Sequence, residues 1–395
     1  MIIGIDASRA IKQQKTGVEW YAYYVIDNLI KIDSQNQYIL YCAAEPDEWL
    51  KKLGERKNVK IKRLRWPFKF FWTQGRLSLE MLFNALDVLF IPASAMPIIH
   101  PKNTIATIHD IGFTAYPEAY GKWQRFYLNW STRFAVKHAR KIITISEFSK
   151  QEIIKYFLTP STNKISVTHL GYDAEKFVNN VGTRRAAPDV LKKYNITQPY
   201  ILTVGRLEKK KNINNLIKAF SLLKKMNENS SEALQNNNHT TPNPSSKEGN
   251  DGFIGKLVLA GSRGKGWEEA EFLIKKYNLQ NEVIEPGYVA EEDLPFLYNG
   301  AELFLFPSLY EGFGLPILEA FACGTPVACS DSSSLPEVGG EAALYFKPND
   351  VDAITKAMQA ILSDENLRQE LIEKGEERVK QFSWQKCTKE TFKVF

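Results

Sequence analysis

The 395-residue sequence predicts an α/β protein with two domains, each built on a parallel β-sheet. Short apolar runs alternate with amphipathic runs along most of the chain, which is the pattern of βα units. The alternation starts again near residue 199, after a polar stretch with Gly and Pro between residues 180 and 195. A chain of this length is also too long for one typical hydrophobic core. Two successive Rossmann-like halves are the simplest arrangement that satisfies these observations.

The first half supplies predicted strands and helices in alternation. Its short apolar runs are the predicted strands: residues 1–7, 38–44, 59–65, 87–92, 104–110, 141–146 and 164–171. Two stretches with apolar residues three and four positions apart are the predicted helices, at residues 17–32 and 146–157. Ser146 directly follows a strand, where a serine caps a helix well. We assign residues 1–185 to this first domain.

The second half repeats the pattern with one interruption. Its predicted strands are residues 199–206, 256–262, 283–289, 301–308 and 325–331. We expect residues 186–375 to form this domain. Within it, residues 226–252 are rich in Asn, Ser and Pro and contain almost nothing to bury, which predicts a disordered insertion. Residues 376–395 are amphipathic and predict a final helix.

Composition narrows the classes of function. The net charge of +6 and the pI near 8.8 are too diffuse to indicate a nucleic-acid partner. The four cysteines have no metal-ligand spacing, which indicates free thiols in a reducing compartment. No stretch reaches the roughly 20 apolar residues of a membrane span, and Asp6 interrupts the apolar start of the chain, unlike a signal peptide. We therefore expect a cytoplasmic protein, or one peripheral on the cytoplasmic face of a membrane.

The stretch "YEGFGLPILEAFACG", residues 310–324, joins the predicted strand at 301–308 to a predicted helix at 316–324. Ligands of open parallel sheets bind at the carboxyl ends of the strands. The glycines allow close backbone approach, and the N–H groups at the helix start attract an anion such as a diphosphate. Glu319, about one turn inside the helix, suits hydrogen bonds from ribose hydroxyls, and Glu311 on the loop can reach a sugar beyond the phosphates. Alternatively, the loop is shaped only by helix-start chemistry, and Glu319 is an ordinary helix residue.

A second candidate group follows the predicted strand at 199–206. In "TVGRLEKKKNI", Arg206 and Lys211 come just beyond the carboxyl end of the strand, at the same sheet edge as the glycine loop. Two cations and a helix start can neutralise the charge that grows on a diphosphate as its bond to a sugar breaks. Lys209 and Lys210 of the same run are expected on a solvated face.

These residues and their order resemble the donor domain of retaining glycosyltransferase family 4 (glycosyltransferase group 1), which has the GT-B fold. "VGRLEKKKNI", "LVLAGS" and the long stretch from "PGYVAEEDL" to "LYFKPND" carry the resemblance over nearly all of residues 199–375. The first half is similar more loosely, through "TGVEWYAYYVIDNLI", "DVLFIP", "TIHDIGF" and "ITISEFSKQEI". The resemblance implies two Rossmann-like domains facing each other across a crevice, with the acceptor domain first and the donor domain second.

The resemblance also implies site residues in both domains. His109 of "IHD" and Glu311 are implied as catalytic residues beside the transferred sugar. The residues implied to bind the donor are Gly17, Arg206, Lys211, Tyr288, Val289, Gly312, Phe313, Gly314, Leu315 and Glu319. From the residues alone, His109 ends an apolar strand, where a lone histidine can equally be structural. The other four histidines are expected to be structural.

The implied reaction is hexose transfer from a nucleotide-diphosphate sugar with retention of configuration. The sugar leaves through an oxocarbenium-like state, an acceptor hydroxyl enters on the same face, and the departing phosphate takes the proton. No metal or other cofactor is expected, because two cations and a helix start already meet the phosphate charge; the "DVD" triplet from Asp350 to Asp352 indicates a helix start instead. A nucleotide-sugar epimerase of the same fold and a non-catalytic nucleotide-sugar binding protein are the alternatives.

Donor sugar and acceptor are the least determined features. "FWTQGRLSL" and "DVLFIP" are similar to stretches of mannosyl- and rhamnosyltransferases that build surface polysaccharides, which favours GDP-mannose and leaves UDP-glucose and UDP-N-acetylglucosamine open. The expected acceptor is a glycan or a lipid-linked glycan. Residues 66–83 combine two tryptophans and four phenylalanines with Lys69 and Arg76, a composition suited to an anionic membrane surface. The alternative is an amphipathic helix that covers the core, with Gln74 and Arg76 in water.

Overall fold

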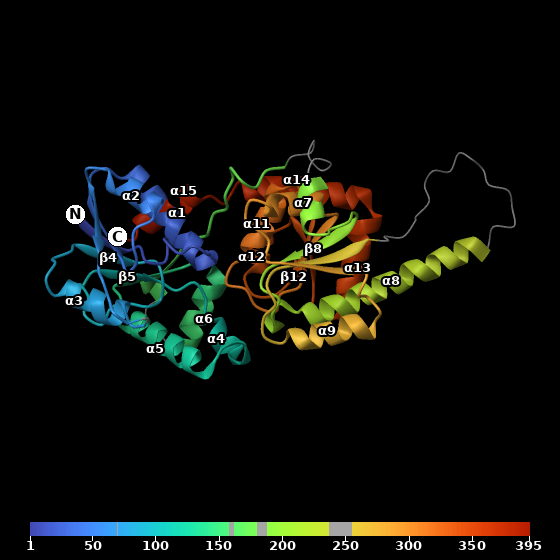
Figure 1. Ribbon diagram of the computed structural model, residues 1–395, viewed down its shortest axis with the longest axis horizontal. Helices are drawn as coiled ribbons and strands as arrows, with labels where there is room; N and C mark the ends of the chain where they lie inside the picture. The colour runs from blue at the N-terminus through green and yellow to red at the C-terminus, as the bar shows by residue number, and fades with distance from the viewer. Residues whose placement is uncertain (69, 158–161, 180–187, 237–254) are drawn as a thin grey trace. The chain divides into compact units, whose positions relative to one another are not determined.

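The computed structural model of the chain describes residues 1–68, 70–157, 162–179, 188–236 and 255–395 (Figure 1). Over these residues the chain forms two compact units. The first comprises Met1–Gly171 and Phe382–Phe395, and the second comprises Tyr172–Gln381. Each unit is an α/β domain around one parallel sheet, as the alternating apolar pattern predicts.

The first domain contains a seven-stranded sheet in the order β3-β2-β1-β4-β5-β6-β7. Its strands are β1 (Ile2–Asp6), β2 (Gln37–Cys42), β3 (Val59–Arg63), β4 (Val88–Ile91), β5 (Thr104–Thr107), β6 (Lys141–Thr144) and β7 (Ile165–Val167). Its longer helices are α1 (Gly17–Ile32), α2 (Glu48–Gly54), α5 (Lys122–His138), α6 (Glu147–Phe157) and α15 (Trp384–Phe392). Its short helical turns are η1 (Thr73–Leu77), α3 (Ser78–Met81), α4 (Gly112–Ala115), η2 (Pro117–Ala119) and η3 (Thr162–Lys164).

The sheet of the first domain is covered on both faces. Helices α1 and α15 pack against each other, and α5 and α6 contribute to a core on the opposite side of the sheet (Figure 1). Strands β4 and β5 are buried at every position, which explains why they are continuous apolar runs rather than alternating ones. The Ser146 side chain accepts a hydrogen bond from the Ser149 N–H at 3.0 Å, which confirms the predicted cap of α6.

The second domain contains a six-stranded sheet in the order β10-β9-β8-β11-β12-β13. Its strands are β8 (Tyr200–Val204), β9 (Lys256–Ala260), β10 (Val283–Gly287), β11 (Leu303–Phe306), β12 (Val327–Ser330) and β13 (Ala343–Phe346). Its helical segments are α7 (Pro188–Lys193), η4 (Lys209–Lys211), α8 (Ile213–Asn236), α9 (Trp267–Lys276), α10 (Leu294–Gly300), α11 (Leu315–Ala322), α12 (Leu335–Gly339), α13 (Val351–Ser363) and α14 (Glu365–Val379). Helices α8, α9 and α13 share the core on one face of the sheet, while α10, α11 and α14 pack together on the other (Figure 1).

The boundary between the domains lies between residues 171 and 172, earlier than the predicted boundary after residue 185. The segment after residue 171 attaches to the second domain through several contacts, of which two involve a ring pair and an ion pair. The Phe177 ring lies 6.0 Å from the ring of Tyr298, and Lys176 pairs with Glu291 at 3.3 Å. The predicted linker is only partly described: residues 180–187 lie outside the described residues, and α7 follows them.

The predicted final helix over 376–395 is wrong as a single element. Helix α14 ends at Val379 in the second domain, and α15 begins at Trp384 and belongs to the first domain. Ser383 starts the new helix, since its side chain accepts the Lys386 N–H at 3.1 Å. The Trp384 ring stacks on Tyr24 of α1 at 4.9 Å, which anchors α15 there.

The predicted disordered insertion begins later than expected. Helix α8 continues to Asn236, so residues 226–236 are helical rather than disordered. The helix is nucleated by its amphipathic first turns, and no proline interrupts the chain between Ile213 and Pro242. The rest of the predicted insertion, residues 237–252, lies outside the described residues.

Candidate functional site

The candidate site of the second domain lies at the carboxyl ends of β8 and β11. These strands are neighbours, and the strand order reverses between them, which makes this the topological switch point of the sheet. The loop after β8 leads to Lys211, and the loop after β11 carries Glu311. The two loops are joined by a hydrogen bond of 2.8 Å from the Leu309 N–H to the Lys210 carbonyl. The prediction that both segments share one sheet edge is therefore confirmed.

Glu311 and Lys211 form an ion pair that is largely shielded from solvent. Their side chains are only 13% and 14% exposed, and the Lys211 ammonium also lies 4.9 Å from the centre of the Phe306 ring. Burial by itself raises the pKa of Glu311, but the charges of Lys211 and Lys210 outweigh it, so this pKa lies below its usual value. Glu311 is a carboxylate at neutral pH, held beside a cation.

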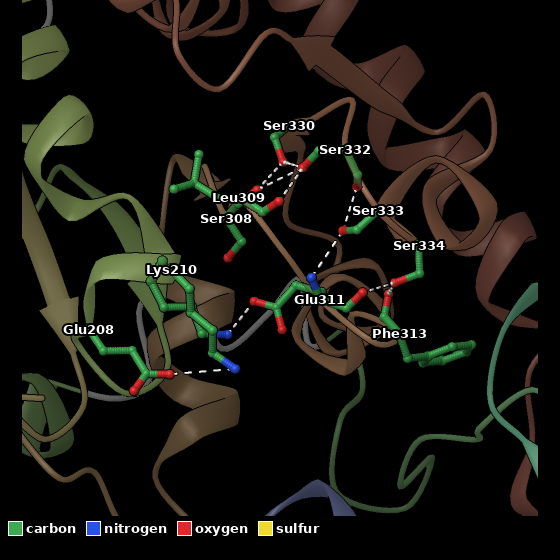
Figure 2. A network of polar contacts seen from close by, with 11 residues as sticks. Glu208, Lys210, Ser308, Leu309, Glu311, Phe313, Ser330, Ser332, Ser333 and Ser334 are labelled. Carbon is green, nitrogen blue, oxygen red and sulfur yellow. Dashed lines mark hydrogen bonds and ion pairs between the residues drawn. The ribbon is translucent and has the colours of Figure 1, made fainter. Parts of the chain in front are cut away.

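Lys210 corrects one expectation about the lysine run. Lys209 is exposed as predicted, whereas Lys210 is only 18% exposed and lies 3.5 Å from Glu208 (Figure 2). The tight turn η4 sends successive lysine side chains in different directions, which a run of identical residues does not reveal. Lys210 is therefore part of the site, where it helps to lower the pKa of Glu311, and its charge is paired with Glu208.

Serines hold the backbone of the glycine loop. The Ser333 hydroxyl accepts the Glu311 N–H at 3.0 Å, and the buried Ser334 hydroxyl lies within hydrogen-bond distance of the carbonyls of Glu311 and Phe313, at 2.9 and 2.7 Å. Figure 2 shows these serines on the side of Glu311 away from the lysines. They fix the loop so that the carboxylate faces the cations. Sequence reasoning missed them, since the serine run follows the next strand, more than twenty residues later.

Helix α11 begins immediately after this loop. Gly314 has φ +123°, and a Cβ there would lie 2.9 Å from a Leu335 methyl, so this position favours glycine on both counts. Pro316 lies in the first turn, and Gly324 follows the helix in a left-handed conformation with φ +66°, both as predicted. The first N–H groups of a helix lack partners within the helix, so the start of α11 can hold an anion.

Glu319 lies inside α11 in a different electrostatic setting. The hydroxyl of the fully buried Tyr298, on α10, donates a hydrogen bond of 2.8 Å to the Glu319 carboxylate. Burial raises the pKa of Glu319 to about 7, although the Tyr298 hydrogen bond acts in the opposite direction. Glu319 therefore titrates near neutral pH while Glu311 stays ionised. No local signal in the sequence indicated Tyr298, which precedes Glu319 by 21 positions.

In the part of the chain that the structure describes, three predicted donor-binding residues make no direct polar contact with the Glu311–Lys211 pair. Arg206 is exposed on the loop after β8, Tyr288 is exposed just after β10, and Val289 beside it is buried. Within the described residues, no hydrogen bond or ion pair joins any of them to Glu311 or Lys211. In the sheet, β9 lies between β10 and β8.

The first domain places its own candidate residues around the start of α1 and the end of β5. The His109 ring lies edge-on to Tyr21 of α1, with centroids 4.8 Å apart, and its Nε2 is 3.3 Å from the Pro92 carbonyl oxygen. Because a carbonyl only accepts, Nε2 carries the proton and Nδ1 is left as an acceptor. Burial lowers the pKa of His109, which keeps the ring neutral at pH 7. Gly17 is exposed and is the first residue of α1.

The acidic segment from Asp350 to Asp352 forms the start of helix α13. In the described parts of the chain, no group of three or more His, Cys, Asp or Glu side chains is placed to hold a metal ion. Asp350 caps α13, because its carboxylate accepts the Ala353 N–H at 2.9 Å. The prediction that the segment Asp350 to Asp352 starts a helix is confirmed.

Comparison with known proteins agrees with this arrangement. Residues 15–176 match the sequence family "Glycosyltransferase Family 4", and residues 255–378 match "Glycosyl transferases group 1". The O-antigen chain mannosyltransferase B of Escherichia coli is 36% identical over 297 residues, which cover 74% of this chain and 70% of that protein.

Two solved structures extend the comparison to the fold. Sucrose-phosphate synthase from Thermosynechococcus elongatus covers 100% of this chain and 98% of its own, with a TM-score of 0.71 and 19% identity. HepE of Anabaena in complex with UDP-glucose covers 100% of this chain and 99% of its own, with a TM-score of 0.69 and 17% identity.

The chain belongs to the group 1 glycosyltransferases of family 4. It has the GT-B fold and is a glycosyltransferase, so the family, fold and enzyme class that the motifs predict are confirmed.

Proposed function

We propose that this protein transfers mannose from GDP-mannose, with retention of configuration, to a hydroxyl of a glycan or lipid-linked glycan. The observation that carries the proposal is the dry Glu311–Lys211 pair at the switch point of the second domain, directly before the start of α11. The UDP-glucose complex of HepE supports a nucleotide sugar as the ligand of this fold. The printed activity of the E. coli relative supports mannose, with UDP-glucose and UDP-N-acetylglucosamine as the other candidate donors.

In this proposal the second domain holds the donor. The diphosphate lies at the start of α11, where Lys211 and Arg206 neutralise it, with residues Gly312 to Leu315 close to the phosphates. Glu319 accepts hydrogen bonds from the ribose hydroxyls, and backbone atoms near Tyr288 and Val289 hold the base. The bond between the sugar carbon and the diphosphate breaks as the acceptor oxygen bonds to that carbon. The acceptor proton passes to the departing phosphate, and the Glu311 carboxylate stabilises the positive charge on the sugar.

The first domain supplies the acceptor side and two further contacts. The free Nδ1 of neutral His109 accepts a hydrogen bond from a hydroxyl of the transferred sugar, and Gly17 leaves room for the donor at the start of α1. The lysines and the helix start carry the phosphate charge without a metal. A cytoplasmic location agrees with the four buried cysteines, all of which are free thiols.

The first test is a donor panel read by thermal stability and by nucleotide release. GDP-mannose, UDP-glucose and UDP-N-acetylglucosamine are added with EDTA, and release of nucleotide is measured with and without mannose-containing acceptors. We expect GDP-mannose to raise the melting temperature most, because a ligand bound only to the folded state stabilises it. We also expect GDP release to require an acceptor.

Other outcomes of this panel would reject parts of the proposal. Interconversion of nucleotide sugars without an acceptor would assign an epimerase. A thermal shift with no release in the presence of any acceptor would assign a binding protein. A shift seen only with a divalent metal would overturn the metal-free site, and a larger shift with a UDP-sugar would replace GDP-mannose as the donor.

A Tyr298→Phe variant tests how Glu319 is held. Without the Tyr298 hydroxyl the Glu319 carboxylate loses a donor, so its pKa rises and a smaller fraction is ionised at pH 7. Donor affinity should increase with pH through about 7 in the wild type. In the variant this midpoint should move to higher pH, with affinity at pH 7 reduced by about 3- to 10-fold and largely restored at high pH. Calorimetric titration across the pH range measures both.

Tyr200→Phe is the matched control for that prediction. Tyr200 is also fully buried, and its hydroxyl donates to the Leu297 carbonyl at 2.7 Å, so the variant loses a similar buried hydrogen bond without touching Glu319. The control should keep the wild-type midpoint. If both variants weakened donor binding equally at every pH, Tyr298 would have only a structural role.

A further inference from the structure

The first domain exposes an unusual concentration of large apolar side chains. Of the nineteen such side chains that are exposed among the described residues, eleven lie between Phe68 and Trp130. We use the term apolar face for six of them: Phe68, Phe70, Phe71, Trp123, Phe126 and Trp130. Concentrations of this kind on a protein surface mark an interaction site rather than ordinary surface composition.

Helix α5 contributes half of this face. Trp123, Phe126 and Trp130 are spaced three and four positions apart, so they lie along one side of the helix, and Trp123 is 85% exposed. Ser131 and Ala135 on the other side are buried against the domain core. The core thus holds α5 with its polar and small residues inward and its aromatic stripe in water.

The other half of the apolar face is a loop that carries Phe68, Phe70 and Phe71. The Trp66 indole N–H donates to the Phe70 carbonyl at 2.9 Å, which ties the loop across its base. Phe71 has φ +63°, an uncommon value for a bulky residue, and is 63% exposed. Its ring lies 6.4 Å from that of Tyr127 on α5, so loop and helix form one surface. The phenylalanines are therefore held outward by specific contacts.

The structure corrects one of the two interpretations of residues 66–83. An amphipathic helix with Gln74 in water is wrong: the segment forms the π-helical turn η1 and the short α3, and Gln74 is buried. The Gln74 side chain donates to the Tyr127 hydroxyl at 2.9 Å, which fastens η1 to α5. These short turns and Trp72 cover the core, whereas Phe68, Phe70 and Phe71 remain exposed.

The helix that carries half of the apolar face is basic. Helix α5 contains four Lys or Arg and no acidic residue. The basic residues before α3 are partly neutralised, since Lys62 and Arg76 pair with Glu80 and Arg63 pairs with Glu45. Exposed aromatic rings beside basic side chains match the interface of an anionic bilayer, where rings enter the headgroup region and cations meet lipid phosphates. A second copy of the chain is a less suitable partner for the apolar face, because two such basic surfaces would repel each other.

We propose that the apolar face docks the protein peripherally on an anionic lipid membrane. None of the helices in the described parts of the chain has the length and apolarity of a membrane crossing, so the contact is with the surface of the bilayer. The inference rests on the first domain alone and holds whichever sugar is transferred. A surface-bound enzyme would meet a lipid-linked acceptor at the same membrane.

The test is flotation of the full-length protein with vesicles. One set contains phosphatidylcholine alone, and the other contains phosphatidylcholine with phosphatidylglycerol. We expect binding to the anionic vesicles only, weakened by salt. A Trp123→Ser/Phe126→Ser variant should bind at least about tenfold more weakly, since each ring loses its burial in the interface. A Lys122→Gln/Arg125→Gln variant should lose the preference for anionic lipid.

Phe272→Ser is the matched control, because Phe272 is a 61% exposed aromatic on α9 of the other domain. It should bind vesicles like the wild type. All variants should keep the donor-induced thermal shift, which separates failure of this proposal from failure of the proposed function. Equal binding to neutral vesicles, no binding at all, or equal loss in the Phe272 variant would overturn the proposal. Light scattering that shows dimers abolished by the Trp123→Ser/Phe126→Ser change would assign the face to a second copy instead.

Discussion

Replacement of Glu311 by Gln is expected to lower turnover by about 100- to 1,000-fold, while GDP alone still stabilises the protein. The variant keeps the size of the side chain and removes its negative charge, which in the ligand-free protein faces Lys211. In the proposed reaction that charge meets the cationic sugar as its bond to the diphosphate breaks. Steady-state turnover and the GDP-induced thermal shift, measured on the same preparations, test the prediction.

Lys211→Met separates two roles for Glu311. If Glu311 only positioned the Lys211 ammonium for the phosphates, both variants would lose the GDP-induced shift together. We expect only Lys211→Met to lose it, because the cation, and not the carboxylate, contacts the diphosphate. Glu271→Gln is the matched control: it breaks the exposed ion pair with Lys275, at 3.0 Å on α9, and should leave turnover unchanged.

Replacement of Glu319 by Gln is expected to stabilise the ligand-free protein above neutral pH and to weaken donor binding. The folded protein raises the pKa of Glu319 from its usual 4.5 to about 7, so the folded state binds the proton more tightly than the unfolded state. Relative to a side chain that cannot ionise, Glu319 costs nothing below pH 4.5. Its cost to folding grows as the pH rises from 4.5 to 7 and reaches a full penalty of up to about 3 kcal/mol above pH 7. A Gln side chain cannot ionise and avoids the penalty.

The advantage of the Glu319→Gln variant should therefore grow between about pH 5 and pH 8. The Gln oxygen still accepts from the Tyr298 hydroxyl, so the buried hydrogen bond is kept. Donor affinity should fall on the order of 100-fold at pH 8, because a charged acceptor for the ribose hydroxyls becomes a neutral amide. Melting curves over this pH range, with and without GDP-mannose, measure both effects.

Glu373→Gln is the control for this pair of effects. Glu373 is exposed on α14 and accepts a hydrogen bond from Gln369 at 3.2 Å, which Gln at this position can also accept. Its replacement should change neither the pH dependence of stability nor donor affinity. A Glu319→Gln variant that matched the wild type in stability at every pH would show that the carboxylate is not raised in pKa by burial.

Local patterns predicted most of the fold. Strand β11 was visible as a continuous apolar run because helices cover the sheet on both faces, and α1 was predicted over its full length because its apolar residues follow the helical period. The failed prediction of a helix at residues 66–83 also has a local cause. In the described part of residues 66–83, the helical residues form two short turns of different kinds, η1 and α3, and neither is long enough to show a period.

The candidate site was predicted only in part. Glu311 and Lys211 were found because each follows a strand end, and strand ends are visible in the sequence. Tyr298 and Ser334 were missed, because they act through contacts with residues more than twenty positions away. Nothing in their own neighbourhood distinguishes such side chains from ordinary buried ones.

The sequence by itself determined the parallel α/β architecture, the family and the positions of the two carboxylates. Periodicity and turn chemistry depend on residues that are close in the sequence. The glycine loop before α11 is likewise defined by a few consecutive residues, so it can be recognised without the structure. Only the tertiary structure decided which carboxylate is charged at neutral pH. Glu311 stays ionised because Lys211, 100 residues earlier, is packed against it, and Glu319 titrates near pH 7 because it is buried beside a tyrosine instead of a cation. Burial and charge act through space, so contacts between distant segments set them.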